Sequence, residues 1–135
     1  MAGILIDTSV LVDAERDSRV LEQLPEDARH AISVITVSEL LHGVHRATSD
    51  RVRIRRQVVV EALLAAIEQL PITSRIARLH AQIWAELQTQ GKIIGAHDLW
   101  IAATAVAHGL TLATANTSEF ERVPALELLP IGRQP

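Results

Sequence analysis

Short apolar runs alternate with longer helical patterns along the chain. Residues 3–6, 31–35 and 110–114 are apolar and bounded by polar or turn-forming residues. Runs of this length that lack an exposed polar face are typical of strands buried in a parallel sheet. Weaker patterns of the same kind predict two further short strands, at residues 72–73 and 126–129.

Helices are predicted between these strands, and proline or glycine ends several of them. Pro25 and Pro71 each stop a helical pattern, and Gly91 and Gly109 follow two others. The expected helices cover residues 9–16, 20–24, 36–44, 49–70, 74–90 and 98–108. Strands that alternate with helices indicate an α/β fold with a mainly parallel sheet. Right-handed crossovers then bring the carboxyl ends of all the parallel strands to one edge.

The composition suits one globular unit over residues 1–135, with 48% hydrophobic and 21% charged residues. There is no cysteine, which excludes disulfides, thiolate zinc sites and cysteine nucleophiles. No apolar run reaches the roughly 18 residues of a membrane-spanning helix, and the N-terminus lacks the basic start of a signal peptide. We therefore expect a cytoplasmic protein without membrane contact.

The charge and the aromatic content bear on nucleic-acid binding. The formal net charge is −3, which leaves no overall positive field for RNA or DNA. Aromatic residues make up 2% of the chain, so a base-stacking platform is not expected. Any binding of nucleic acid would need a local basic patch or a metal ion.

Polar residues follow the predicted strands at comparable places. Asp7 comes directly after the first strand, and Glu39 lies in the first predicted turn of the helix after the second. Asp98 opens the helix before the last long strand, and Asn116 and Glu119 follow that strand. A parallel sheet would gather these side chains at its carboxyl edge, where open α/β sheets bind their ligands.

Each of these residues also has an ordinary structural interpretation. Asp7 suits an N-cap, and the stretch from Thr36 to Glu39 has the form of a capping box. Asp98 suits a helix dipole, and Asn116 suits a turn. Together, however, the acids would repel one another unless a cation were bound. Carboxylate oxygens favour Mg²⁺ or Mn²⁺, which activate water and shield phosphate charge in phosphodiester hydrolysis.

Four segments carry a family resemblance, in order and over nearly the whole chain. They read ILIDTSVLV, ISVITVSELLHGV, HDLWIAATAVAHGLTLAT and ANTSEFERVPALEL. The chain resembles the PIN-domain ribonucleases and, more narrowly, the VapC-type toxins of bacterial toxin–antitoxin pairs. This resemblance implies a single PIN-like domain over residues 1–135, with three α/β/α layers and a central sheet of four to five strands.

The resemblance also assigns roles to residues. Asp7, Glu39 and Asp98 match the core metal-binding acids, and Thr8 or Ser9 matches the hydroxyl beside the first acid. The last part of the pattern is altered. Thr114 matches a supporting hydroxyl, whereas Asn116 and Glu119 stand where the family often has an aspartate. Either Glu119 is the fourth ligand, or Asn116 orients the metal through a water.

Basic and histidine residues give two further candidate sites. A run of arginines suits either a solvated surface or RNA phosphates, whose binding would depend on salt. It comprises Arg46, Arg51, Arg53, Arg55 and Arg56. His42, His45 and His97 could suggest a transition-metal site, but no zinc motif accompanies them.

The sequence thus predicts an Mg²⁺- or Mn²⁺-dependent endoribonuclease toxin. Attack by metal-activated water, rather than by the ribose 2′-hydroxyl, would give 5′-phosphate and 3′-hydroxyl products. The resemblance implies a structured RNA substrate (tRNA or rRNA), a homodimer and a small VapB-like antitoxin. The apolar segments at residues 40–44 and 58–67 are the expected contact surfaces. The alternative is a PIN-like RNA-binding or scaffold protein without catalysis. A phosphotransfer receiver or a haloacid-dehalogenase-like phosphatase is disfavoured, because Lys92 precedes a helix and Ser9 stands where the phosphatase needs an aspartate.

Overall fold

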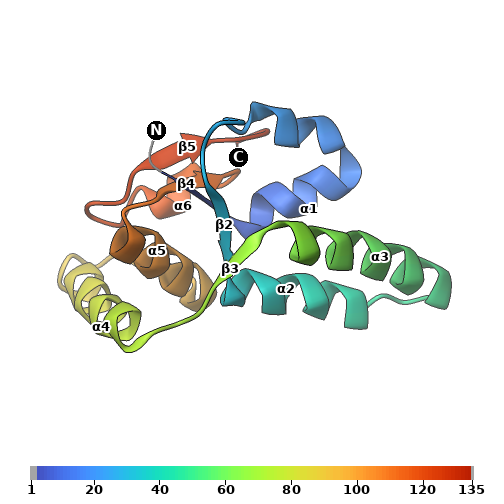
Figure 1. Ribbon diagram of the computed structural model, residues 1–135. Coiled ribbons are helices and arrows are strands. Elements are labelled where there is room, and N and C mark those ends of the chain that lie inside the picture. Colours follow the sequence, from blue (N-terminus) through green and yellow to red (C-terminus); the bar gives the residue numbers. More distant parts are fainter. Residues whose placement is uncertain (1–2, 135) are drawn as a thin grey trace.

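The computed structural model describes residues 3–134 and contains a central sheet of five strands (Figure 1). The strands are β1 (Ile4–Ile6), β2 (His30–Ser33), β3 (Glu68–Leu70), β4 (Thr111–Thr114) and β5 (Leu128–Pro130). Their order across the sheet is β3-β2-β1-β4-β5, and every neighbouring pair is parallel. The predicted α/β fold with a parallel sheet is confirmed.

Helices cover both faces of this sheet (Figure 1). On one side lie α1 (Thr8–Arg16), the 3₁₀ helix η1 (Ser18–Gln23), α2 (Val34–His45) and α3 (Asp50–Ala66). On the other side lie α4 (Ser74–Thr89), α5 (Ala96–His108) and the short α6 (Thr117–Phe120). The result is the three-layer α/β/α arrangement. No helix within residues 3–134 has the length and apolar character needed to cross a membrane.

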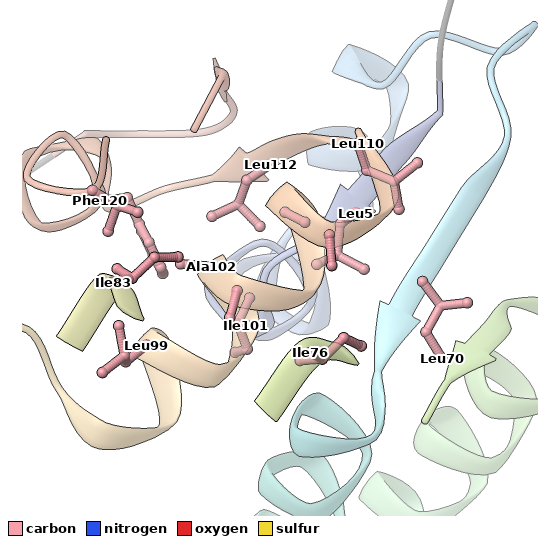
Figure 2. Packing of buried hydrophobic residues seen from close by; sticks show 14 of the residues in the cluster. Leu5, Leu70, Ile76, Ile83, Leu99, Ile101, Ala102, Leu110, Leu112 and Phe120 are labelled. Carbon is pink, nitrogen blue, oxygen red and sulfur yellow. The ribbon is translucent and has the colours of Figure 1, made fainter. Parts of the chain in front are cut away.

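The central strand β1 is buried on both faces, and its side chains alternate between them. Leu5 points into the core beneath α4 and α5, where Leu112 and Phe120 also lie (Figure 2). Ile4 and Ile6 belong to the opposite core, beneath α1 and α2. Because successive side chains of a strand point to opposite faces, a run of three apolar residues is what a two-sided core requires.

The order of the strands creates a switch point between β1 and β4. From β1 the chain moves outward to β2 and β3, and then returns to place β4 on the other side of β1. The connections after β1 and β4 therefore diverge to opposite faces and leave a crevice at the carboxyl edge. Asp7 follows β1 and Asn116 follows β4, so both predicted site residues lie at this crevice.

Two predicted boundaries and one predicted helix cap were wrong. The helix after β2 begins at Val34 and not near residue 36, because Ser33 is its N-cap and accepts a hydrogen bond from the backbone N–H of Ile35. Glu39 consequently lies in the second turn, so the capping box predicted for residues 36–39 does not exist. The third strand is Glu68–Leu70, before Pro71, whereas we expected it after that proline.

One predicted contact surface is also corrected. Leu40 and Val44 are 7% and 2% exposed, because they face the sheet and belong to the core. Part of the second segment is accessible, since Val58 and Val59 on α3 are 65% and 40% exposed. Leu40 and Val44 are therefore not available for a partner, whereas α3 has an exposed apolar face.

Candidate active site

Asp7 is the most deeply buried acid at the carboxyl edge, with 3% of its surface exposed. Its Oδ2 atom accepts hydrogen bonds from the hydroxyls of Ser9, at 2.5 Å, and Thr114, at 2.8 Å. Burial raises the pKa of Asp7, the two hydroxyls lower it, and the nearby charge of Glu39 raises it further. The net direction is upward, so a neighbouring positive charge would stabilise the ionised form.

The hydroxyl of Ser9 also joins the ends of the two central strands. Its Oγ atom accepts a hydrogen bond from the backbone N–H of Ala115, at 3.0 Å. Thr114 in turn accepts a hydrogen bond from the backbone N–H of Asn116, at 2.9 Å. Ser9 and Thr114 thus fix the Asp7 carboxylate relative to β4. Both were predicted as supporting hydroxyls, and the structure brings both to Asp7.

Glu39 projects from α2 toward the same edge and contacts a different hydroxyl. Thr8 donates a hydrogen bond to Glu39 Oε1, at 2.8 Å, and its Oγ1 lies 2.9 Å from Oγ1 of the fully buried Thr36. The other carboxylate oxygen of Glu39 lies 3.5 Å from Nδ1 of His97. Thr8 therefore positions Glu39, whereas Ser9 positions Asp7, and the two predicted hydroxyls have separate partners.

Asp98 and Glu119 form a close carboxyl pair beside Gly95. Glu119 accepts hydrogen bonds from the backbone N–H of Gly95, at 2.8 Å, and from the side-chain amide of Asn116, at 2.9 Å. A Cβ atom at Gly95 would lie 3.5 Å from Asp98 Oδ2 and 3.5 Å from Glu119 Oε1. Gly95 thus marks the point at which the two carboxyl groups meet. Asn116 contacts Glu119 and orients it.

The pair shares a proton. Burial, the hydrogen bond with Glu119 and the charges of Asp7, Glu119 and Glu39 raise the pKa of Asp98 to about 8. Burial also acts to raise the pKa of Glu119, but the Gly95 N–H, Asp98 and Asn116 more than offset it and lower that pKa. At neutral pH without a cation, these shifts favour one proton on the pair. Two adjacent carboxyl groups at such an edge avoid a double negative charge in this way.

The chemistry of these side chains fits a divalent cation, although their placement is not that of a formed metal cage. Asp7, Glu39, Asp98 and Glu119 supply hard oxygen donors, and their mutual repulsion favours a cation. Within residues 3–134, no group of three or more histidine or acidic side chains is arranged so that it could hold a metal ion. Metal binding therefore remains a prediction, and it would have to displace the proton of Asp98.

A groove of about 750 Å³ leads away from Glu39 between α1, α2 and α3. Val12, Val52 and Val59 form much of its apolar surface. Its basic residues are Arg16, Arg46, Arg55 and Arg56. Three members of the predicted arginine run thus share a groove with a candidate metal ligand.

The other two members of that run lie outside the groove lining. Arg53 pairs with Asp50, at 2.8 Å. Arg56, although it lines the groove, is held by Glu15, at 2.9 Å, and by the carbonyl oxygen of Gly43, at 2.8 Å. A part in RNA binding stays a prediction for all five arginines.

Sequence reasoning missed Gly95 in this site and gave Thr36 and His97 other roles. Gly95 supplies a backbone N–H to Glu119, Thr36 lies against Thr8, and His97 lies near Glu39. The glycine directly before a helix that carries Asp98 was a usable signal, because such a glycine allows close approach of another group. Thr36 was considered only as part of a capping box, and His97 only as part of a transition-metal site with His42 and His45, whereas they contact Thr8 and Glu39.

Comparisons with known proteins agree with this arrangement. The family model described as "PIN domain" matches residues 4–126. Ribonuclease VapC1 of Rickettsia felis is 35% identical over 130 residues, which are 96% of this chain and 97% of the relative. The tRNA(fMet)-specific endonuclease VapC of Salmonella typhimurium is 35% identical over 101 residues, which are 75% of this chain and 74% of that relative.

Solved structures also match over nearly the full length. One match is a chain in the crystal structure of VapBC2 from Rickettsia felis bound to a DNA fragment of the VapBC2 promoter. That chain has a TM-score of 0.84 and is 31% identical in sequence. The match covers 96% of this chain and 98% of that one.

Proposed function

The chain belongs to the PIN-domain family and, within it, to the VapC proteins, and on this premise we propose that it is the ribonuclease toxin of a toxin–antitoxin pair. The observation that carries the proposal is the convergence of four acids at the β1–β4 switch point. Asp7 and Glu39 each have a dedicated hydroxyl, and Asp98 is paired with Glu119. Such a cluster is costly without a cation and supplies the oxygen donors that a divalent ion prefers, although within residues 3–134 the side chains do not form a metal cage.

Asp7, Glu39, Asp98 and Glu119 would hold Mg²⁺ or Mn²⁺. When bound, the ion would activate water and shield the charge on the scissile phosphate. The chain's own residues keep the acids in place, because Ser9 and Thr114 orient Asp7 and Thr8 orients Glu39. Attack by water rather than by the ribose 2′-hydroxyl leaves 5′-phosphate and 3′-hydroxyl ends.

The RNA substrate is proposed to be structured RNA such as tRNA or rRNA. A relative of this chain carries the name tRNA(fMet)-specific endonuclease, which supports a tRNA as the first substrate to test. Arg46 and Arg55 are exposed in the groove beside Glu39 and would contact phosphates. Binding would then weaken as the salt concentration rises.

A small VapB-like antitoxin and a homodimer complete the proposal. The solved VapBC2 complex of Rickettsia felis supports a partner of this kind. The groove between α1, α2 and α3 offers an apolar surface at Val12 and Val59 that continues to Glu39. A partner segment seated there would block access to the acids. A charged substitution at Val59, which is 40% exposed, should weaken antitoxin binding without unfolding the toxin.

The alternative function, an inactive RNA-binding or scaffold protein, rests on the altered fourth position of the acid pattern. Glu119 stands beside Asp98 and is oriented by Gly95 and Asn116, so the longer side chain still reaches the cluster. This geometry gives the alternative no support. Metal binding without RNA cleavage would nevertheless establish it.

The proposal is tested by cleavage of total bacterial RNA with purified toxin that is free of antitoxin. Reactions contain Mn²⁺ or Mg²⁺, or EDTA, and compare the natural protein with Asp7→Asn. Asp27→Asn is the matched control, because Asp27 is an exposed acid outside the cluster. We expect discrete cuts that need both the metal and Asp7. Metal-independent cleavage, or cleavage by Asp7→Asn, would contradict the proposal.

A further inference from the structure

A second cavity of about 470 Å³ lies between α4, α5 and the loop that joins them. It is separate from the α1–α2–α3 groove, and its volume lies in the range of small-molecule pockets. Both tryptophans of the chain, Trp84 and Trp100, line it together with His80. The low aromatic content of the chain argued against a base-stacking platform. The aromatic content alone does not show, however, that the two tryptophans and His80 lie together in one cavity.

Two of the three rings stack on each other, and the third meets one of them edge-on. The ring centroids of His80 and Trp100 are 3.6 Å apart with an interplanar angle of 14°, and Trp84 meets His80 edge-on at 5.9 Å. His80 is 8% exposed, whereas Trp84 is 53% exposed. The stack therefore fixes the inner rings and leaves the indole of Trp84 open to a further flat group. An exposed, pre-oriented aromatic ring binds such a group at low entropic cost.

The cavity adjoins the acid cluster through the start of α5. Ala96 lines the cavity and stands directly after Gly95, whose N–H contacts Glu119. Asp98 lies in the same first turn of α5. The cavity and the acid cluster therefore share the first turn of α5.

The remaining lining suits a nucleotide. Ile93 and Ile94 contribute apolar surface. Apart from the titratable His80, Lys92 is the only basic residue that lines the cavity, and it is the only lysine of the chain. Exposed apolar surface next to one cation complements a flat base joined to a phosphate. Single-stranded RNA is commonly recognised by bases that leave the helix and stack on aromatic side chains.

From these observations we infer that the cavity binds one unstacked nucleobase of the RNA substrate, close to the cleaved bond, with the base on Trp84 and a neighbouring phosphate near Lys92. This inference rests on the proposed ribonuclease function and extends it, because it names a residue that selects the cleavage site. A base that must leave its helix to be bound restricts cleavage to loops and single-stranded segments. The rival occupant of this apolar face is a second copy of the chain.

The test measures kcat/KM for an RNA that the natural protein cleaves, with Trp84→Ala, Trp84→Phe and the control Ile54→Ala. Ile54 is likewise an exposed apolar residue, at 62%, but lies on α3 and outside the lining of both cavities. We expect Trp84→Ala to lose about 10-fold, in line with base stacking on an aromatic ring, and Trp84→Phe to lose less than about 3-fold. Light scattering on each variant reports the oligomeric state.

Abasic substitution of the RNA, one nucleotide at a time around the cut, then separates direct contact from a structural effect. One abasic position should cost the natural protein about 10-fold and cost Trp84→Ala nothing further, because both changes remove the same contact. Unchanged cleavage by Trp84→Ala, or additive losses at every position, would overturn the inference. So would conversion of a dimer to a monomer by Trp84→Ala, which would assign the face to a second copy. A natural protein that cleaves no RNA would instead refute the proposed function itself.

Discussion

Replacement of Asp98 by asparagine should stabilise the metal-free protein at alkaline pH. The pKa of Asp98 is raised to about 8 by burial, by its hydrogen bond with Glu119 and by the surrounding acids, whereas the ordinary value is 3.8. The folded protein therefore holds a proton that the unfolded chain releases. Between about pH 4 and pH 8, stability falls as pH rises, because the folded state binds more protons there than the unfolded state.

The size of the effect follows from this difference. The full difference between the two pKa values would correspond to about 6 kcal/mol at most. Asp98 is only half-buried and shares its proton with Glu119, so solvent screening reduces the effect, and we expect about 2 kcal/mol between pH 5.5 and pH 9. Asparagine has almost the same shape and cannot ionise, so the Asp98→Asn protein should lose this part of the pH dependence.

Urea unfolding in EDTA at pH 5.5 and pH 9 measures the difference directly. The advantage of Asp98→Asn over the natural protein should be about 2 kcal/mol larger at pH 9 than at pH 5.5. The control Asp27→Asn, an exposed acid for which the structure gives no neighbouring acid cluster, should follow the natural protein at both pH values. Parallel pH profiles for Asp98→Asn and the natural protein would refute the reasoning.

Three further predictions concern other contacts of the site. Thr114→Val removes a hydrogen bond from a buried carboxylate, so calorimetry at pH 7.5 should show a loss of about 2 kcal/mol, whereas no loss would mean that Ser9 alone satisfies Asp7. Gly95→Ala places a methyl group 3.5 Å from both Asp98 and Glu119, which the fold can accommodate. We expect metal affinity, measured by titration calorimetry, to fall roughly tenfold, while the unfolding midpoint stays within a few degrees. Arg56→Met breaks contacts to Glu15 and the Gly43 carbonyl oxygen and should cost about 1 kcal/mol in urea unfolding. Exposed Arg55→Gln should leave stability unchanged but weaken RNA binding and reduce its salt dependence, and the reverse pattern would contradict these assignments.

The parts of the fold that sequence could predict are those governed by local pattern. The apolar runs of β1, β2 and β4 stand out because a strand buried on both faces tolerates few polar residues. Strand β3 was misplaced because its sequence, Glu-Gln-Leu, is mostly polar and exposed, as an edge strand allows. Its pairing with β2 is a tertiary contact that no local pattern encodes.

The candidate site shows the same division. The parallel topology predicts that Asp7, after β1, and Glu119, after β4, lie at one edge of the sheet, whereas Glu39 and Asp98 reach this edge from the early turns of α2 and α5. The proton shared by Asp98 and Glu119 depends on a distance between two side chains and on burial, which follow only from packing. The gathering of Trp84 and Trp100 around His80 likewise depends on how α4 packs against α5.

The chemistry of the cut ends tests the central claim most directly. RNA is cleaved by the natural protein in Mn²⁺ and then split into two samples. One sample is ligated by an enzyme that requires a 5′-phosphate end, and the other by an enzyme that requires a 5′-hydroxyl end. If the four acids direct water at the phosphorus atom, the new ends carry 5′-phosphate and 3′-hydroxyl groups, and EDTA abolishes them. A 2′,3′-cyclic phosphate with a 5′-hydroxyl end would mean attack by the ribose 2′-hydroxyl, and would contradict this account of Asp7, Glu39, Asp98 and Glu119.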